Sequence, residues 1–334
     1  MARKAPNDRD ATDRQMYPSR DAHVRKPSPR SSKKKMSSTT APPVAANPAA
    51  ANPNACELSA PGISMSEYPI KLVAIDLDGT LLNSSKQVSA QTVQALRCLP
   101  HSNVKVVIAS ARPPRSVRHI YKALGLDTLQ INYNGALIWD EVRGRTVFHR
   151  PMSGGMVREI ITAARGLFPE ILVSCEILDR WYTDRADQTY TTETGRMFKP
   201  DVICDVDEFC DGPITKLMLL GEPRLVRRLA PILSDQFGGM VTVLHADDDL
   251  LQIMDKRVGK AVALKKVAAT YGIDSDEIMA IGDAPNDVGM LQLAGVAIAM
   301  DNAHPLVKKV ADWIAPSNDD HGVHAALKRY GLCS

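Results

Sequence analysis

The sequence lacks several features that would assign it to common classes of protein. Its six cysteines form no Cys-x-x-Cys pair, and no apolar signal-peptide core precedes them. It also has no apolar run of the roughly 18 residues that a membrane-spanning helix needs. We therefore expect reduced thiols in an intracellular protein with no membrane partner.

A phosphate-binding P-loop and internal repeats are missing as well. Lys260 follows a glycine, but the next residue is Ala261 and the upstream glycine of the GxxxxGK[ST] pattern is absent. Hydrolysis of nucleoside triphosphates by a P-loop is thereby disfavoured.

Residues 1–66 lack the material for a hydrophobic core. They contain nine of the 22 prolines, one aromatic residue, and only four residues of the Ile, Leu, Val and Phe class. Their 11 Lys and Arg against five Asp and Glu give +6, which leaves 30 against 33, or −3, for residues 67–334. We predict a disordered arm over 1–66 that is basic and rich in proline and alanine. The slightly acidic remainder disfavours a nucleic-acid partner.

The arm leaves the location of the protein open. A transit peptide is rich in serine and arginine and poor in acids, and four aspartates between residues 8 and 21 argue against one there. Residues 22–66, however, contain one acidic residue, Glu57. We expect a cytoplasmic protein, and the alternative is a plastid or another organelle if the arm is a transit peptide. Whether the arm targets, docks or is partly absent from the mature protein stays open.

From residue 70 onward, short apolar segments alternate with helical patterns. The segments Ile70–Ile75, Val104–Ala109 and Glu277–Ile281 are too short for helices, and each is followed by polar residues. Ser89–Leu99 and Lys260–Tyr271 have the spacing of amphipathic helices. This alternation predicts an α/β fold with a Rossmann-like parallel-sheet core, whose ligands bind at the carboxyl ends of the strands.

Two acidic motifs follow predicted strands of this sheet. DLDGT occupies residues 76–80 and GDAPND occupies residues 282–287. Period-two alternation puts Asp76 and Asp78 on one side of an extended chain, where two adjacent anions need a cation. Oxygen ligands of this kind suit Mg²⁺. Lys216 and Lys260 are the candidate cationic side chains.

These residues resemble the haloacid dehalogenase superfamily, in the Cof-like branch of phosphatases with an inserted α/β cap. Residues 76–80 are similar to its first motif, Ser110 to the second, Lys260 to the third, and residues 282–291 to the fourth. Further similar segments are NYNGAL (132–137), AIAMDNA (297–303) and SNDDHGV (317–323). The resemblance spans roughly residues 70–330 and leaves out only the arm.

The resemblance implies a role for each matching residue. Asp76 would be the nucleophile that forms an aspartyl-phosphate, and Asp78 would be the general acid and base. Magnesium would be held by the side chains of Asp76 and Asp283 and by the backbone carbonyl of Asp78, with Asp287 outside these ligands. The transferring phosphoryl group would be held by Ser110, Lys260 and Asn286. Lys260 is preferred to Lys216 because it occupies the position of the third motif.

The resemblance also implies a division into domains and a class of substrate. We expect a catalytic core over 67–152 and 255–334, and a substrate-specificity cap over 153–254. A large cap favours small phosphorylated metabolites, such as a sugar phosphate, pyridoxal phosphate or a flavin-type phosphate. Two alternatives remain: a phosphomutase or phosphotransferase that uses the same intermediate, and a catalytically idle binding protein. The substrate, the oligomeric state and the cap residues that contact the leaving group stay open.

Overall fold

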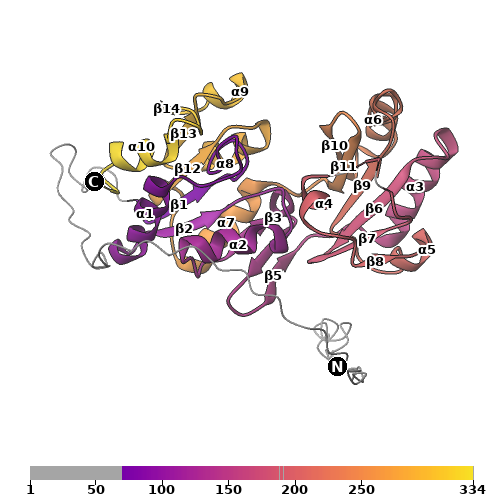
Figure 1. Cartoon of the computed structure of the whole chain (residues 1–334), viewed down its shortest axis with the longest axis horizontal. Helices are drawn as coiled ribbons and strands as arrows, with labels where there is room; N and C mark the ends of the chain where they lie inside the picture. The colour runs from indigo at the N-terminus through magenta and orange to yellow at the C-terminus, as the bar shows by residue number, and fades with distance from the viewer. Residues whose placement is uncertain (1–69, 188, 191, 334) are drawn as a thin grey trace, which may run out of the picture. The chain divides into compact units, whose positions relative to one another are not determined.

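The computed structural model describes residues 70–187, 189–190 and 192–333 (Figure 1). The predicted arm over 1–66 and the first three residues of the predicted core lie outside the described residues. Labels follow Figure 1, with η for the 3₁₀ helices.

A five-stranded parallel sheet forms the core, in the order β14-β13-β12-β1-β2. The strands are β1 Leu72–Ile75, β2 Lys105–Ile108, β12 Ile278–Gly282, β13 Val296–Met300 and β14 Trp313–Ala315. In the central strand β1, Ile75 pairs with Ile108 of β2 and with Ile281 of β12. This register brings the residues that follow the three strands to one edge of the sheet. The predicted parallel core is confirmed.

Helices connect and cover these strands. They are α1 Ala90–Cys98, α2 Pro114–Leu124, α7 Lys260–Tyr271, α8 Val288–Leu293, α9 Pro305–Lys308 and α10 Gly322–Arg329, with the 3₁₀ helices η1 Leu99–Ser102, η3 Ser275–Glu277 and η4 Pro285–Asp287. Their apolar sides join the sheet in one buried cluster. The side chain of Ser89 accepts a hydrogen bond from the N–H of Thr92 and caps α1. α7 spans the residues that the periodicity predicts.

A small antiparallel sheet, β3-β4-β5, follows α2 in the chain. Its strands are β3 Gln130–Asn132, β4 Leu137–Asp140 and β5 Arg145–His149, and the turn η2 Tyr133–Gly135 joins the first two. β3 continues from the core sheet through a parallel bridge between Ala109 and Ile131. The segment Asn132–Leu137 therefore begins at the carboxyl edge of the core sheet.

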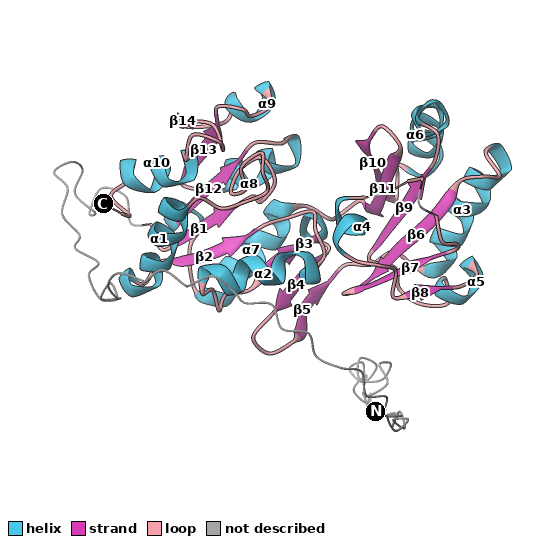
Figure 2. Ribbon diagram, in the orientation of Figure 1, coloured by secondary structure: helices cyan, strands magenta, loops and turns pink. Residues whose placement is uncertain are grey.

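A second sheet of six strands has the order β10-β11-β9-β6-β7-β8. It lies in the segment where a cap is expected, and this region is called the cap below. Its elements are α3 Gly154–Leu167, β6 Leu172–Ile177, β7 Arg180–Thr183, α4 Glu193–Met197, β8 Val202–Ile203, α5 Val206–Phe209, β9 Lys216–Leu220, α6 Pro223–Phe237, β10 Val241–Asp247 and β11 Leu250–Asp255. The long helices α3 and α6 lie against one face of this sheet (Figure 2) and share a buried apolar cluster with it. An additional α/β domain, as the sequence predicts, is thus present.

Two expectations about composition can be compared with the structure. Four described cysteines, Cys175, Cys204, Cys210 and Cys333, are free thiols. Among the described residues, no helix combines the length and the apolar character that crossing a membrane requires.

Candidate active site

Asp76 lies directly after β1, at the carboxyl edge of the core sheet. Its N–H donates to the carbonyl of Ile281 at 3.0 Å, which continues the pairing with β12, and its side chain is 7% exposed. One carboxylate oxygen from each of Asp76, Asp283 and Asp287 lies within 4.8 Å of the other two. The two acidic motifs, which are far apart in the sequence, therefore bring three carboxylates together at this edge of the sheet.

Lys260 reaches this cluster from the first residue of α7. Its Nζ forms an ion pair with Asp76 and a second with Asp287 at 2.6 Å, and its side chain is fully buried. Burial lowers the pKa of Lys260, but the two carboxylates outweigh burial and hold the pKa above its usual value. Lys260 is therefore a buried ammonium group that supplies one positive charge against three carboxylates.

The pKa shifts of the carboxylates indicate that the site has too little positive charge. Burial raises the pKa of Asp76 well above its usual value, and Lys260 only partly opposes this while Asp287 adds to it. Burial likewise raises the pKa of Asp283. A divalent cation between Asp76 and Asp283 would remove this excess of negative charge. The residues present thus fit a hard cation with oxygen ligands.

The two acids of the fourth motif have different surroundings. Asp283 accepts a hydrogen bond at 2.7 Å from Thr80 Oγ1. Asp287 is fully buried, and its Oδ2 accepts the N–H groups of Asp283 at 3.0 Å and Ala284 at 2.9 Å while its Oδ1 faces Lys260. Both oxygens of Asp287 are therefore engaged in holding the loop and the lysine. That Asp287 lies outside the metal ligands stays a prediction, since one of its oxygens is also close to those of Asp76 and Asp283.

Asp78 lies at the same edge of the sheet as Asp76, but its carboxylate contacts different residues. Arg112 donates to both of its carboxylate oxygens, at 2.7 Å and 2.6 Å, and Lys86 Nζ lies 2.9 Å away. Burial raises the pKa of Asp78, but the two cations outweigh burial and hold the pKa below its usual value. Asp78 is thus an ionised carboxylate between two cations in this structure. The sequence predicted a role for neither Arg112 nor Lys86.

Ser110 and Asn286 belong to the loops around the cluster. Ser110 is buried, and its Oγ accepts the N–H of Arg112 at 3.1 Å. Asn286 donates from Nδ2 to Oδ1 of Asn134 at 2.9 Å. Both side chains are bonded to neighbouring loops rather than to the carboxylates.

The alternative cation, Lys216, lies in β9 of the cap. Its Nζ is 5.2 Å from the centre of the Tyr133 ring, and burial lowers its pKa to about 8. The structure therefore brings Lys260, and not Lys216, against Asp76.

Three polar residues that the sequence reasoning did not use hold the segment after β1. Asn302 donates to the carbonyl of Gly79 and Asn318 to that of Leu82, each at 2.8 Å. Asp319 accepts from the Ser84 hydroxyl at 2.6 Å. These three residues lie in the segments AIAMDNA and SNDDHGV. The similarity of those segments to the family could therefore have identified them from the sequence.

Comparison with known proteins agrees with this fold. Residues 73–327 match the model of the haloacid dehalogenase-like hydrolases. The 5-amino-6-(5-phospho-D-ribitylamino)uracil phosphatase YitU of Bacillus subtilis is 28% identical over 264 residues, which are 78% of this chain and 97% of YitU. The phosphatase YwpJ of Bacillus subtilis is 29% identical over 283 residues, covering 78% of this chain and 99% of YwpJ.

A solved structure extends the agreement to three dimensions. The haloacid dehalogenase-like hydrolase from Bacteroides thetaiotaomicron superposes with a TM-score of 0.70 at 26% identity, over 78% of this chain and 99% of that one. The family match covers the core strands, the cap and both acidic motifs. The chain belongs to the haloacid dehalogenase-like hydrolases and is a phosphatase of that superfamily.

Proposed function

We propose that the protein is a magnesium-dependent phosphatase that hydrolyses small phosphorylated metabolites through an aspartyl-phosphate on Asp76. The observation that carries this proposal is the buried cluster of Asp76, Asp283 and Asp287 with Lys260, at the carboxyl edge of a parallel sheet. Ligands of such sheets bind at that edge.

In this proposal Mg²⁺ is held by the carboxylates of Asp76 and Asp283 and by the backbone carbonyl of Asp78. The support is the excess of negative charge at these acids and their oxygen-only donor set. When bound, the ion supplies the positive charge that offsets repulsion between a carboxylate nucleophile and a phosphate dianion. Asp287 keeps its role of holding Lys260 and the loop.

The chemistry assigned to this chain has two steps. A carboxylate oxygen of Asp76 bonds to phosphorus as the bond to the leaving oxygen breaks, and Asp78 gives that oxygen a proton. Asp78 then takes a proton from the water molecule that displaces phosphate from Asp76. Lys260, Ser110 and Asn286 would hold the phosphoryl oxygens, where negative charge gathers.

Asp78 can act as an acid only after it leaves its present partners and takes up a proton from the solvent. Arg112 and Lys86 keep its carboxyl ionised. We propose that the substrate draws Asp78 away from these cations as the leaving oxygen reaches the site.

We also propose domain limits and a location. The core would comprise 67–152 and 255–334 and the cap 153–254, which is supported by the two separate apolar clusters. A cytoplasmic location is proposed, with a plastid or another organelle as the alternative if residues 1–66 are a transit peptide. Fusion of these 66 residues to a fluorescent protein distinguishes the two.

An assay of phosphate release across a panel of phosphorylated metabolites tests the function. The panel holds sugar phosphates, pyridoxal phosphate, flavin-type phosphates and the substrate that the name of YitU gives. We expect release without an added acceptor, loss of activity in a chelator, and recovery with Mg²⁺. Activity in metal-free buffer contradicts the metal, and release that needs an acceptor hydroxyl indicates a phosphotransferase.

The variant Asp76→Asn tests the nucleophile. An amide of the same shape cannot attack phosphorus, so we expect phosphate release to fall roughly a thousandfold or more. Thermal unfolding should still show a folded protein, because Lys260 retains Asp287. Near-normal turnover in Asp76→Asn removes Asp76 from the proposal.

A further inference from the structure

The turn between β3 and β4 has an uncommon backbone. Tyr133, Asn134 and Gly135 have φ angles of 50°, 55° and 101°. A bulky aromatic residue with positive φ is an outlier, and such conformations persist only where the surrounding structure holds them. The contacts of the turn Asn132–Gly135 therefore hold this backbone in place.

On one side the turn touches the loop after β2. The N–H of Tyr133 donates to the carbonyl of Arg112 at 3.3 Å, and the N–H of Asn134 donates to that of Ser110 at 3.0 Å. The side chain of Asn132 also donates to the carbonyl of Arg112, at 3.2 Å. The turn is thereby bonded to the backbone of the proposed phosphate-binding Ser110.

The same turn touches two further parts of the active site. Asn134 Oδ1 accepts the hydrogen bond from Asn286 Nδ2 at 2.9 Å. A side chain at Gly135 would collide with the carbonyl of Gly259, the residue before Lys260. One turn thus contacts the loops or helix that carry Ser110, Lys260 and Asn286.

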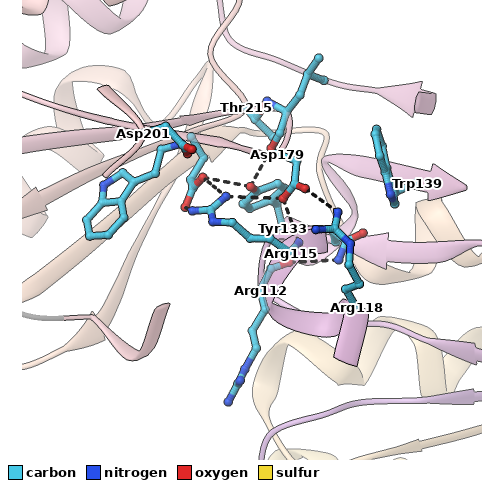
Figure 3. A network of polar contacts seen from close by, with 12 residues as sticks. Arg112, Arg115, Arg118, Tyr133, Trp139, Asp179, Asp201 and Thr215 are labelled. Atoms are coloured by element: carbon cyan, nitrogen blue, oxygen red, sulfur yellow. Dashed lines mark hydrogen bonds and ion pairs between the residues drawn. The ribbon is translucent and has the colours of Figure 1, made fainter. Parts of the chain in front are cut away.

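On its other side the turn is bonded to the cap. The fully buried Tyr133 hydroxyl lies 2.7 Å from the carbonyl of Leu178 and 3.1 Å from Glu176 Oε2. Arg115 donates to both oxygens of Glu176, at 2.9 Å and 2.7 Å, and its N–H donates to Asp179 at 2.8 Å. Figure 3 shows Tyr133, Arg115 and Asp179 drawn together in this network, while Arg112 points away from it.

We propose that Tyr133 and Asn134 are positioning residues that couple contact with the cap to the orientation of the Asn286 side chain. The inference rests on the proposed function, in which Asn286 holds the phosphoryl group. The Tyr133 hydroxyl holds the turn to Glu176 and Leu178, the turn holds the Asn134 amide, and that amide orients Asn286.

Loss of the cap contact acts on the active site through this chain of bonds. A buried hydroxyl without its acceptors is unfavourable, so Tyr133 moves when Glu176 and Leu178 withdraw. The left-handed backbone of the turn is then no longer held, and Asn134 releases Asn286. The phosphoryl site is complete only while the cap contact is made.

A double-mutant cycle between Tyr133→Phe and Asn286→Ala tests the coupling. Tyr133→Phe keeps the ring and removes the hydroxyl, and we expect kcat for p-nitrophenyl phosphate to fall about tenfold. In the Asn286→Ala background the same change should cost less than about twofold, because the group that Tyr133 positions is already gone. An equal loss in both backgrounds overturns the proposal.

Tyr121→Phe is the matched control. Tyr121 is also buried in the core, and its hydroxyl donates to the carbonyl of Leu129 at 3.0 Å. Removal of this hydroxyl should lower the thermal midpoint but leave kcat within about twofold of the parent protein. A tenfold fall in kcat for Tyr121→Phe would show that loss of any buried hydroxyl is sufficient, and would overturn the specific role of Tyr133.

Hydrogen exchange supplies a readout that needs no activity. Tyr133→Phe and Asn134→Gly should both speed exchange in the peptide over Gly282–Leu291, whereas Tyr121→Phe should not. Glycine keeps the positive φ at position 134 and removes only the amide side chain. Unchanged exchange in both turn variants overturns the coupling. If the parent protein releases no phosphate from any substrate, the proposed function fails while exchange still tests the coupling.

Discussion

Asp76 and Asp78 are two residues apart, and their carboxylates lie in opposite electrostatic surroundings. Asp76 faces two other acids and one lysine, and burial raises its pKa. Asp78 is half-exposed and lies between Arg112 and Lys86, which hold its pKa down. The alternation along the strand predicted a shared edge, but the cations that separate the two acids come from other loops.

At the scale of single residues, the two buried lysines provide a direct comparison. Lys260→Met removes the cation that faces Asp76 and Asp287, so we expect kcat/KM to fall by roughly a hundredfold or more. Lys216→Met removes a buried lysine of the cap that faces Tyr133. Its effect on kcat/KM should be less than about tenfold.

Steady-state phosphate release by both variants, with thermal unfolding as a check on folding, gives the ranking. A larger loss of activity in Lys216→Met than in Lys260→Met would show that Lys216, and not Lys260, has the role of the third motif.

At the scale of elements, the turn after β1 is fixed by a close approach between two motifs. Gly79 has φ 83°, and a side chain there would collide with the carboxylate of Asp283. We expect Gly79→Ala to lower phosphate release by roughly tenfold or more, since it displaces a proposed metal ligand. It should also lower the free energy of unfolding by about 1–3 kcal/mol.

Gly144→Ala is a control that separates the effect of backbone strain from the effect of displacing Asp283. Gly144 also has a left-handed backbone, with φ 60°, but a side chain there meets no atom within 4 Å. We expect it to lose about 1 kcal/mol of stability and keep full phosphate release. Equal loss of activity in the two variants would show that backbone strain alone, and not contact with Asp283, impairs the enzyme.

At the scale of the whole molecule, His149 makes stability depend on pH. It ends β5, and its Nε2 lies 2.8 Å from Oγ1 of Thr215, which precedes the cap strand β9. Burial lowers the pKa of His149 to about 4. Between pH 6.5 and 4 the unfolded chain therefore binds a proton that the folded protein does not, and stability falls as the pH falls.

His149→Gln removes this titration and retains a group that can bond to Thr215. Relative to the variant, the parent protein should lose about 2 kcal/mol of unfolding free energy between pH 7.5 and pH 4.5. Urea unfolding at the two pH values measures the difference. Parallel pH profiles for the two proteins would show that His149 takes up a proton in the folded protein as readily as in the unfolded chain.

The sequence by itself determined the class of fold and the order of the core strands along the chain, and it predicts which edge of the sheet carries the chemistry. Short apolar segments followed by Asp76, Ser110 and Asp283 are local signals. A buried parallel strand needs continuous apolar residues, whereas the residues after its carboxyl end can be polar. The helix over 260–271 was predicted to the residue, since its pattern and its Gly272 terminus are also local.

Only the tertiary structure decided which partner each charged group takes. Lys260 and Asp76 are 184 residues apart, and Asn134 and Asn286 are 152 residues apart. Neither pairing leaves a trace in periodicity or composition. The positions of Lys86, Tyr133 and Glu176 depend on turns with positive φ and on contact between two sheets. The energies that fix such contacts come from burial and charge balance in the assembled core, which no single segment contains.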